Sequence, residues 1–412
     1  MQSAAHQEKH FQQYIIDRLV EQGWKLGDSK FYDTERAVYP EDLESWIKTS
    51  GQQEKWDKLE RLNGAKTLEV LMDRLDKALE KQGTMQVLRQ GFSIAGCGLI
   101  EMTEAAPEDK RNAAVIERYQ ANILRVVPEL KYHPAREFAI DLVLFINGLP
   151  VATVELKTDF TQSCEAAMDQ YRNDRLPYDA QTKRREPLLT FKRGAVVHFA
   201  MSDSEIMMAT KLDGENTFFL PFNKGRKDES GTVHAGNPPG EIKADGTQEY
   251  PVAYFWEAVC QPDAWLRIFH SFVYVEKKDV VDIQGNWSKK ETLIFPRFHQ
   301  WTAVNQMLAD ARENGAGMTY LCDHSAGSGK TSTISWTAHD LVKLREDNGD
   351  SVFNSVIIVT DRNVLDGQLQ DAVKQIDHQF GVIAAIDRQK SSKSKSKQLS
   401  EALLSGTPIV VV

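Results

Sequence analysis

Residues 137–157 read EFAIDLVLFINGLPVATVELK, two apolar runs joined by an Asn-Gly pair. Both runs are rich in the β-branched and aromatic residues that strands favour. Asn-Gly between two such runs is the strongest short signal for a β-hairpin. Asp141, Glu155 and Lys157 interrupt these runs, where an unpaired buried charge is costly. The stretch therefore predicts a hairpin that carries charged groups inside apolar strands.

The spacing of these three residues favours a site that hydrolyses phosphodiesters with the help of a metal ion. An acid on one strand and an E-x-K sequence on its partner can bring two carboxylates and one ammonium group together. Carboxylate oxygens suit Mg²⁺, which lowers the pKa of bound water and stabilises charge on phosphoryl oxygens. Asp141 and Glu155 are the predicted metal ligands, and Lys157 is predicted to orient the attacking water. The alternative is a solvent-facing hairpin that alternates charged and apolar residues.

The register of the hairpin gives a sharper expectation. With a regular two-residue loop, Asp141 lies opposite Val154, and Glu155 points to the other face of the sheet. A three-residue loop or one β-bulge shifts the register and places Asp141 opposite Glu155, with Lys157 on the same side. We therefore predict an odd loop or a bulge.

The sequence on either side of the hairpin predicts further strands and helices. Apolar runs at 121–127 and 195–201 have the composition of strands. Apolar residues recur at helical spacing in the stretch that ends at Gly23, over 66–82, and over 163–175. We expect a sheet with flanking helices.

Two of the predicted helices carry further candidates for the site. Gln170, Tyr171 and Arg175 can help to position DNA or a metal-bound water, and Glu8 is an additional candidate metal ligand. The alternative for each is an exposed position on a helix. Two basic clusters can contact phosphates without reading sequence, or can be solvated surface: Lys183, Arg184 and Arg185, and Lys192 and Arg193.

A second site is predicted in residues 319–336, TYLCDHSAGSGKTSTISW. An apolar lead-in, a small-residue loop and a helix-compatible segment follow one another, which is the order of a strand, a phosphate-binding loop and a helix. Glycines let the backbone approach phosphate oxygens, the lysine reaches the β and γ phosphates, and the threonine hydroxyl binds Mg²⁺. The predicted nucleotide-binding residues are Gly327, Ser328, Gly329, Lys330 and Thr331, with Thr331 as the metal ligand.

The loop departs from G-x-x-x-x-G-K-[ST] at one position, because His324 occupies the first glycine site. The alternative is a chance Gly/Ser loop before a helix. Residues 351–366 follow as an apolar strand, a polar turn and a helix start, which predicts the second parallel strand of a βαβ unit. No later strand ending in D-E precedes Val412, and the final PIVVV run has no turn or cap behind it. We expect a piece of a longer protein, with the Walker-B acid beyond Val412.

Length and composition limit the class of protein. A chain of 412 residues exceeds one usual hydrophobic core, so two domains or slightly more are expected. The sequence has no membrane-spanning run or secretory signal, so a cytoplasmic location is expected. The four cysteines form no C-x-x-C pair, which argues against disulfides or structural zinc and favours reduced core residues. With a net charge of −9, any DNA contact must be local or assisted by partner chains.

Turn-rich and low-complexity stretches indicate the domain organisation. Residues 223–250 are dense in Gly, Pro, Asp and Asn and predict a long surface loop. The Lys/Ser tract at 388–397 cannot bury a face and predicts a mobile loop. The expected division is a first domain over 1–265, a linker over 266–290 and a second domain over 291–412.

With both sites identified, the chain resembles the N-terminal part of the R (restriction) subunit of type I restriction-modification enzymes. Besides the hairpin and HSAGSGKT, the stretches that carry the resemblance are QYRNDR, FFLPFNKG, YFWEAV, FPRFHQ and IVTDRNVLDGQL. The resemblance implies an α/β chain. A PD-(D/E)xK nuclease domain with a mixed sheet would be followed by the truncated first RecA-like lobe of a superfamily 2 translocase, with a parallel sheet.

The resemblance also implies roles for particular residues. Asp141, Glu155 and Lys157 would form the catalytic set, and Gln300 in FPRFHQ would contact adenine. Gln170 and Tyr171 join the catalytic candidates. Related nucleases often carry Q-x-x-x-Y on this helix, whereas these two residues are adjacent here.

The implied activity is that of a type I site-specific deoxyribonuclease that hydrolyses ATP and translocates DNA. The implied cofactors are ATP and Mg²⁺, with S-adenosylmethionine bound only by the modification subunit. The implied partners are double-stranded DNA and the modification (methyltransferase) and specificity subunits, and no membrane. Two alternatives stay open: a stand-alone ATP-coupled DNA repair or anti-phage nuclease without methyltransferase partners, and a nucleotide-regulated scaffold whose hairpin carboxylates are structural.

Overall fold

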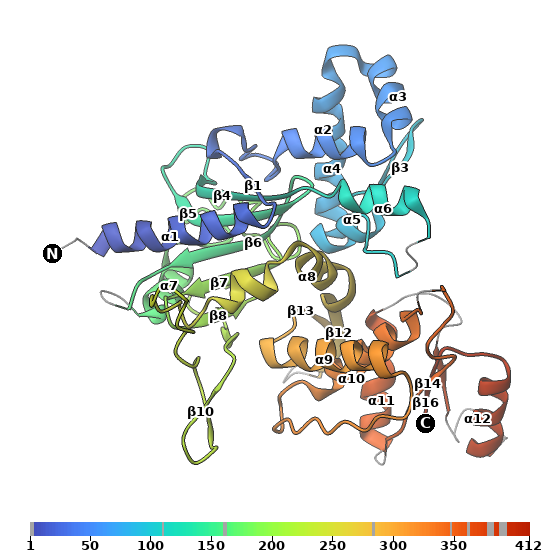
Figure 1. The fold of residues 1–412 in the computed structure, drawn as a ribbon. Coiled ribbons are helices and arrows are strands. Elements are labelled where there is room, and N and C mark those ends of the chain that lie inside the picture. The colour runs from blue at the N-terminus through green and yellow to red at the C-terminus, as the bar shows by residue number, and fades with distance from the viewer. Residues whose placement is uncertain are drawn as a thin grey trace. The chain divides into compact units, whose positions relative to one another are not determined.

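The computed structural model describes residues 4–108, 111–159, 163–281, 285–346, 348–360, 363–376, 383–386 and 394–412 (Figure 1). The chain divides into two compact units. The first comprises Met1–Ala106 and Ala114–His270, and the second comprises Pro107–Ala113 and Ser271–Val412.

A mixed sheet of seven strands forms the centre of the first unit, as predicted. β1 pairs with β4 and β6 with β7 in parallel, and the other neighbours are antiparallel. In spatial order the strands are β1 (Lys25–Leu26), β4 (Leu124–Lys131), β5 (Ala139–Ile146), β6 (Leu149–Leu156), β7 (Val197–Met201), β8 (Ile206–Ala209) and β9 (Leu220–Pro221).

The predicted hairpin is β5 and β6, joined by a tight turn at Asn147 and Gly148. Both residues have positive φ, 49° and 86°, as a type I′ turn requires. The Asn147 side chain accepts a hydrogen bond from the backbone N–H of Ile123 at 2.6 Å and donates to the carbonyl of Met102 at 2.8 Å. A Cβ on Gly148 would lie 2.6 Å from the carbonyl oxygen of Tyr39. The turn therefore tolerates only glycine at position 148.

The register of this hairpin contains the predicted bulge. Ile146 pairs with Leu149 across the two-residue turn, but Leu142 pairs with Val154, with a shift between Leu144 and Phe145. The extra residue in β6 moves the pairing by one position. The next step along the ladder therefore places Asp141 opposite Glu155, on one face of the sheet.

The three helices predicted in the first unit are present. They are α1 (Ala4–Glu21), α4 (Thr67–Gln82) and α7 (Cys164–Asn173). α1 buries Phe11, Ile15 and Leu19, three of the residues with helical spacing in the sequence, while Val20 of the same set is exposed. Besides the short strands β1, β8 and β9, the elements that the sequence did not predict are η1 (Ser29–Phe31), α2 (Pro40–Thr49), α3 (Gln53–Asn63), η2 (Gly64–Lys66), α5 (Thr84–Gln90), α6 (Ala113–Gln120), and the hairpin β2 (Phe92–Ile94) with β3 (Gly98–Ile100).

The expected surface loop at 223–250 is irregular apart from the short hairpin of β10 (Arg226–Lys227) and β11 (Val233–His234). A mostly buried helical stretch follows it, consisting of η3 (Phe255–Val259), α8 (Pro262–Arg267) and η4 (Ile268–Phe272), of which η3 and η4 are π-helical turns. The segment 266–290, expected as a linker, thus begins in helical structure. It continues into the long antiparallel hairpin of β12 (Tyr274–Val281) and β13 (Trp287–Ile294).

The second unit contains a three-stranded parallel sheet in the order β14-β16-β15, as the predicted parallel lobe requires. The final PIVVV run provides the central strand, and its valines and isoleucine are buried except at the last residue. After the β12–β13 hairpin, the second unit consists of α9 (Phe298–Asn314), α10 (Lys330–Lys343), β14 (Val356–Ile358), α11 (Asn363–Ile376), β15 (Ile383–Ala385), α12 (Lys395–Leu404) and β16 (Ile409–Val411).

The prediction of a strand directly before the phosphate loop is wrong. Residues 319–322 have no regular structure, and Leu321 is 91% exposed. A strand needs a hydrogen-bonded neighbour to be stable, and none of the described strands lies beside this segment.

The Lys/Ser tract also differs from the expectation. Residues 388–393 lie outside the described residues, but the tract continues into α12, which begins at Lys395. Ser394 caps this helix by accepting a hydrogen bond from the backbone N–H of Lys397. Ser394, whose Lys/Ser-rich surroundings predicted a loop, is therefore the N-cap of a helix.

The cysteine prediction holds in part. All four thiols are free, and Cys164 and Cys260 are buried core residues. Cys322 is exposed and Cys97 is half-buried, so these two do not belong to a core. Across the described parts of the chain, no helix has the length and apolar character to cross a membrane.

Candidate active site

Asp141 is held at the start of β5 by contacts to its carboxylate and to its backbone. Its Oδ2 accepts a hydrogen bond from the backbone N–H of Leu156 on β6, at 2.6 Å. Its carbonyl oxygen accepts from the side-chain amide of Gln12 on α1, at 2.7 Å. The partly exposed carboxylate is therefore fixed at the open end of the hairpin, across from Glu155.

Glu155 lies on β6 and is completely buried. Its Oε1 accepts a hydrogen bond from Nε of Arg175 at 2.5 Å, and its Oε2 has no hydrogen-bond partner among the described residues. Burial raises the pKa of Glu155 well above its usual range, the charge of Asp141 raises it further, and Arg175 opposes both effects. Asp141 and Glu155 thus lie close enough to interact, and Oε2 of Glu155 accepts no hydrogen bond from the described residues.

Lys157 follows the end of β6 and is mostly buried. Its Nζ donates to the carbonyl of Leu156 at 2.7 Å and lies 3.4 Å from Oε1 of Glu8. Burial raises the pKa of Glu8, Lys157 lowers it, and Asp141 raises it. The structure therefore brings Glu8 of α1 to the same group of charges as Asp141, Glu155 and Lys157.

The chemistry of these donors fits a divalent cation. Carboxylate oxygens from Asp141 and Glu155 are hard ligands of the kind that Mg²⁺ prefers, whereas the carboxylate of Glu8 does not lie within 4.8 Å of both. A buried carboxylate oxygen without a donor is costly, and a cation removes that cost. The lack of a hydrogen-bond donor to the buried Oε2 of Glu155 is therefore the observation that most favours a metal ion at this position.

Tyr171 and Gln170 lie on α7, and their surroundings differ from those of the hairpin residues. Tyr171 is fully buried, and its hydroxyl hydrogen-bonds Oγ1 of Thr153 at 2.8 Å. The same Oγ1 contacts Nδ1 of His198, also at 2.8 Å. Burial is the main cause that raises the pKa of Tyr171, and the negative charge of Glu155 raises this pKa further. Gln170 is half-buried, with its Oε1 unpartnered among the described residues. Neither residue makes a described hydrogen bond to Asp141 or Glu155.

Three of the basic residues that the sequence assigned to DNA contacts form ion pairs within the protein. Arg175 pairs with Glu155 rather than with solvent. Arg193 is 5% exposed and pairs with Asp76 at 2.5 Å, and it is therefore not available to phosphates. Arg184 pairs with Glu35. The role of Arg175 has no sequence signal, because its partner lies on another element.

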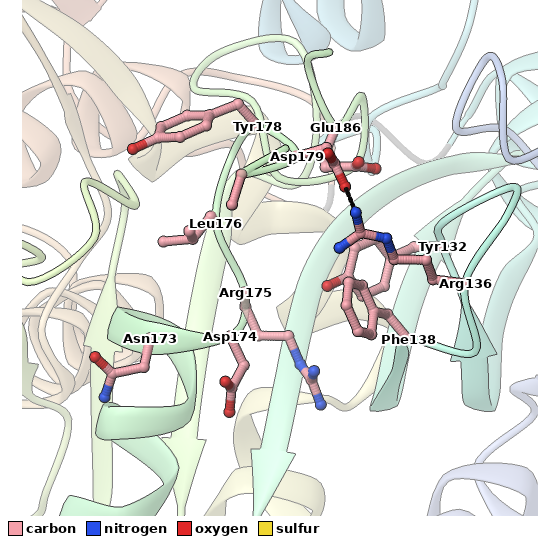
Figure 2. A pocket seen from close by; sticks show the side chains of 11 residues that line it. Tyr132, Arg136, Phe138, Asn173, Asp174, Arg175, Leu176, Tyr178, Asp179 and Glu186 are labelled. Carbon is pink, nitrogen blue, oxygen red and sulfur yellow. Dashed lines mark ion pairs between the residues drawn. The ribbon is translucent and has the colours of Figure 1, made fainter. Parts of the chain in front are cut away.

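Arg175 also lines a cavity of about 200 Å³ between the end of β4 and the segment after α7 (Figure 2). Tyr132, Arg136, Phe138 and Asp179 are among its other lining residues. The Arg136 guanidinium lies 3.0 Å from Oδ2 of Asp179.

Beside the cavity, His133, Asp179 and Glu186 bring possible metal ligands within 4.8 Å of one another. Nε2 of His133 lies 3.4 Å from Asp179 and 3.5 Å from Glu186. The backbone N–H of Ala135 donates to Nδ1 of His133 at 3.1 Å, so Nε2 is the ring nitrogen that faces the two carboxylates. Oδ2 of Asp179 and Oε1 of Glu186 are buried without a hydrogen-bond partner among the described residues, as Oε2 of Glu155 is. The guanidinium of Arg136 already places a positive charge beside Asp179.

In the second unit, the loop before α10 has the backbone that a phosphate-binding loop needs. Gly327 and Gly329 have positive φ, 75° and 82°, and Gly329 is the N-cap of α10. Nζ of Lys330 donates to the carbonyls of His324 at 2.7 Å and Ser325 at 3.0 Å. The Lys330 ammonium group thus lies within the loop and donates hydrogen bonds to two of its carbonyl oxygens.

Gln300 of α9 packs directly against this loop. Its Nε2 donates to the carbonyl of Gly329 at 2.9 Å, and its Oε1 accepts from the backbone N–H of Arg297. Oγ of Ser328 is buried without a hydrogen-bond partner among the described residues, and Thr331 is half-buried on the first turn of α10. The structure therefore brings together all the residues predicted around the phosphate loop.

Comparison with known proteins finds two family models that match parts of the chain. Residues 6–217 match the model of the family described as type I restriction enzyme R protein N terminus. Residues 299–412 match the model described as SWI2/SNF2 ATPase. The first match contains the hairpin site, and the second contains the phosphate loop.

Two curated proteins are similar to the chain. The type I restriction enzyme HindI endonuclease subunit of Haemophilus influenzae is 24% identical over 252 residues, which cover 58% of this chain and 21% of that protein. A provisionally named type I restriction enzyme MjaVIIIP endonuclease subunit of Methanocaldococcus jannaschii is 23% identical over 261 residues, which cover 62% of this chain and 21% of that protein. The chain thus spans about a fifth of the length of these relatives. Since the first family match covers half of the residues, the chain belongs to the type I restriction enzyme R protein N-terminal family.

Proposed function

We propose that the first unit is a PD-(D/E)xK nuclease that hydrolyses DNA phosphodiester bonds with Mg²⁺, as part of a type I restriction enzyme. The bulged register of β5 and β6 carries this proposal, because it sets Asp141 opposite Glu155 and leaves a buried Oε2 without a donor. Family membership supports a restriction nuclease.

Each residue of the site has a separate role in the proposed reaction. Asp141 and Glu155 would hold Mg²⁺, which lowers the pKa of bound water and stabilises charge on the phosphoryl oxygens. Lys157 presents an ammonium group beside these acids and would orient the attacking water and stabilise the developing charge. Glu8 holds the ammonium group of Lys157 from the side of α1, and it is a further candidate ligand.

We propose that the second unit supplies a nucleotide site whose ATP hydrolysis drives translocation of DNA. Amides of Gly327, Ser328 and Gly329 would cradle the phosphates at the N-terminus of α10. Lys330 would exchange its two carbonyl partners for the β and γ phosphates. Thr331 would offer its hydroxyl to Mg²⁺.

The proposed contact between Gln300 and adenine needs an exchange of partners. Both groups of its amide already bond to protein, so one of these hydrogen bonds must open for the base. Gln300 would then link the base to the phosphate loop through Gly329.

The proposed partners are double-stranded DNA and the modification and specificity subunits, with S-adenosylmethionine bound by the modification subunit. The curated relatives are named as subunits, which supports an assembly. A net charge of −9, together with the internal pairing of Arg193, favours DNA binding that depends partly on other chains.

The experiment is a comparison of variants of the full-length subunit in the assembled enzyme. Asp141→Asn and Lys157→Ala are expected to abolish cleavage and leave ATP hydrolysis unchanged, since they act only on the phosphodiester. Lys330→Ala is expected to remove both activities, because cleavage depends on translocation. Asp169→Asn is the matched control, since Asp169 is exposed and pairs with Arg172 at 3.0 Å. Cleavage that survives Asp141→Asn refutes the assignment.

A further inference from the structure

One contact in the first unit determines which oxygen of Glu155 is free. Arg175 donates through Nε to Oε1 at 2.5 Å, and both side chains are buried. Oε2 of the same carboxylate has no described donor. The two oxygens of a carboxylate are chemically equivalent, so the difference comes from their surroundings, and Arg175 is the donor that distinguishes Oε1.

Arg175 is itself held in place by the end of α7. Its backbone N–H donates to the carbonyl of Gln170 at 3.0 Å. Its guanidinium interacts with the hydroxyl of Tyr132 and forms part of the cavity wall (Figure 2). The guanidinium therefore has neighbours on two sides, and its rigid planar geometry holds the donor to Oε1 in place better than a flexible lysine ammonium would.

We propose that Arg175 is a positioning residue for the metal site, which holds Oε1 of Glu155 so that Oε2 remains available to a divalent cation shared with Asp141. This proposal rests on the proposed nuclease function and assigns Arg175 a role other than contact with DNA. Ligating carboxylates are commonly held by a hydrogen bond to their second oxygen, and loss of such a partner weakens metal binding.

The test measures Mn²⁺ binding to the full-length subunit by calorimetry, with Asp141→Asn as the baseline that identifies the site. Arg175→Met is expected to weaken Mn²⁺ binding by about 10-fold to 100-fold. Arg175→Lys is expected to recover part of that loss, since it keeps the charge but not the planar fork. Arg172→Met is the matched control and is expected to bind Mn²⁺ as the wild type does, because Arg172 pairs with Glu165 and Asp169 on the surface of α7. Thermal melts establish that each variant is folded. If Arg175→Met does not fold, the comparison of Arg175→Lys with the wild type is the test.

A double variant separates positioning from a general structural effect. If Arg175 acts through Glu155, adding Arg175→Met to Glu155→Gln changes the remaining Mn²⁺ affinity by less than about twofold. Equal losses in the two backgrounds, or wild-type affinity in Arg175→Met, overturn the role of Arg175 and leave the nuclease proposal standing. Absence of any Asp141-dependent Mn²⁺ binding in the wild type overturns the nuclease site and this role with it.

Discussion

Single side chains in this molecule show what sequence pattern can and cannot indicate. Asp141 and Glu155 were predicted as a site because they interrupt apolar strands, and the structure places them opposite each other. The partner of Glu155 could not be predicted, because Arg175 lies 20 residues further along and reaches it only through the path of α7. Buried ion pairs of this kind depend on tertiary geometry that local pattern does not contain.

His198 gives a prediction about pH and stability. It is 1% exposed, and burial lowers its pKa to about 3 from 6.5. Between these two values the unfolded chain binds a proton that the folded chain does not, so stability falls as the pH falls. His198→Asn keeps a polar partner for Thr153 and is expected to reduce this dependence by up to about 1.4 kcal/mol per pH unit.

The measurement is urea unfolding at several pH values across that window. His10→Asn is the control, since His10 is exposed on α1. An identical pH slope in wild type and His198→Asn would show that the buried imidazole does not govern acid stability.

Among secondary-structure elements, the β5–β6 hairpin was the most predictable. Two apolar runs and an Asn-Gly turn specify it locally, and the bulge followed from requiring that both acids share a face. The strand expected before the phosphate loop failed, because residues 319–322 have no described neighbouring strand to pair with. Local composition suffices for a hairpin but not for a strand whose partner is distant in sequence.

The tight turn at Gly148 gives a prediction at this level. Gly148→Ala forces a Cβ to within 2.6 Å of a backbone oxygen, in addition to the strain of positive φ. Gly231 is the matched control, because it has nearly the same φ, 83°, and open space around it. Gly148→Ala is expected to destabilise the first unit by about 1–3 kcal/mol more than Gly231→Ala does. Denaturant midpoints measure the difference, and equal midpoints would contradict the steric account.

For the complete chain, the division into two units agrees with the two family matches. The match to the R protein N terminus ends at residue 217 within the first unit, and the ATPase match begins at residue 299 within the second. Residue patterns predicted a sheet with flanking helices in the first unit and parallel strands in the second, and the mixed character of the first sheet was implied by the family resemblance. The helices α2 and α3 were missed because they are only 10 and 11 residues long and depend on packing against each other and against α4.

Anomalous diffraction from crystals of the full-length subunit grown with Mn²⁺ tests most directly whether Asp141 and Glu155 share a cation. The proposed site predicts an anomalous peak about 2.1 Å from a carboxylate oxygen of each residue, with Oε2 of Glu155 as one ligand. The peak should vanish in Asp141→Asn crystals. A map with no peak between these two carboxylates at saturating Mn²⁺ would contradict the proposed nuclease site.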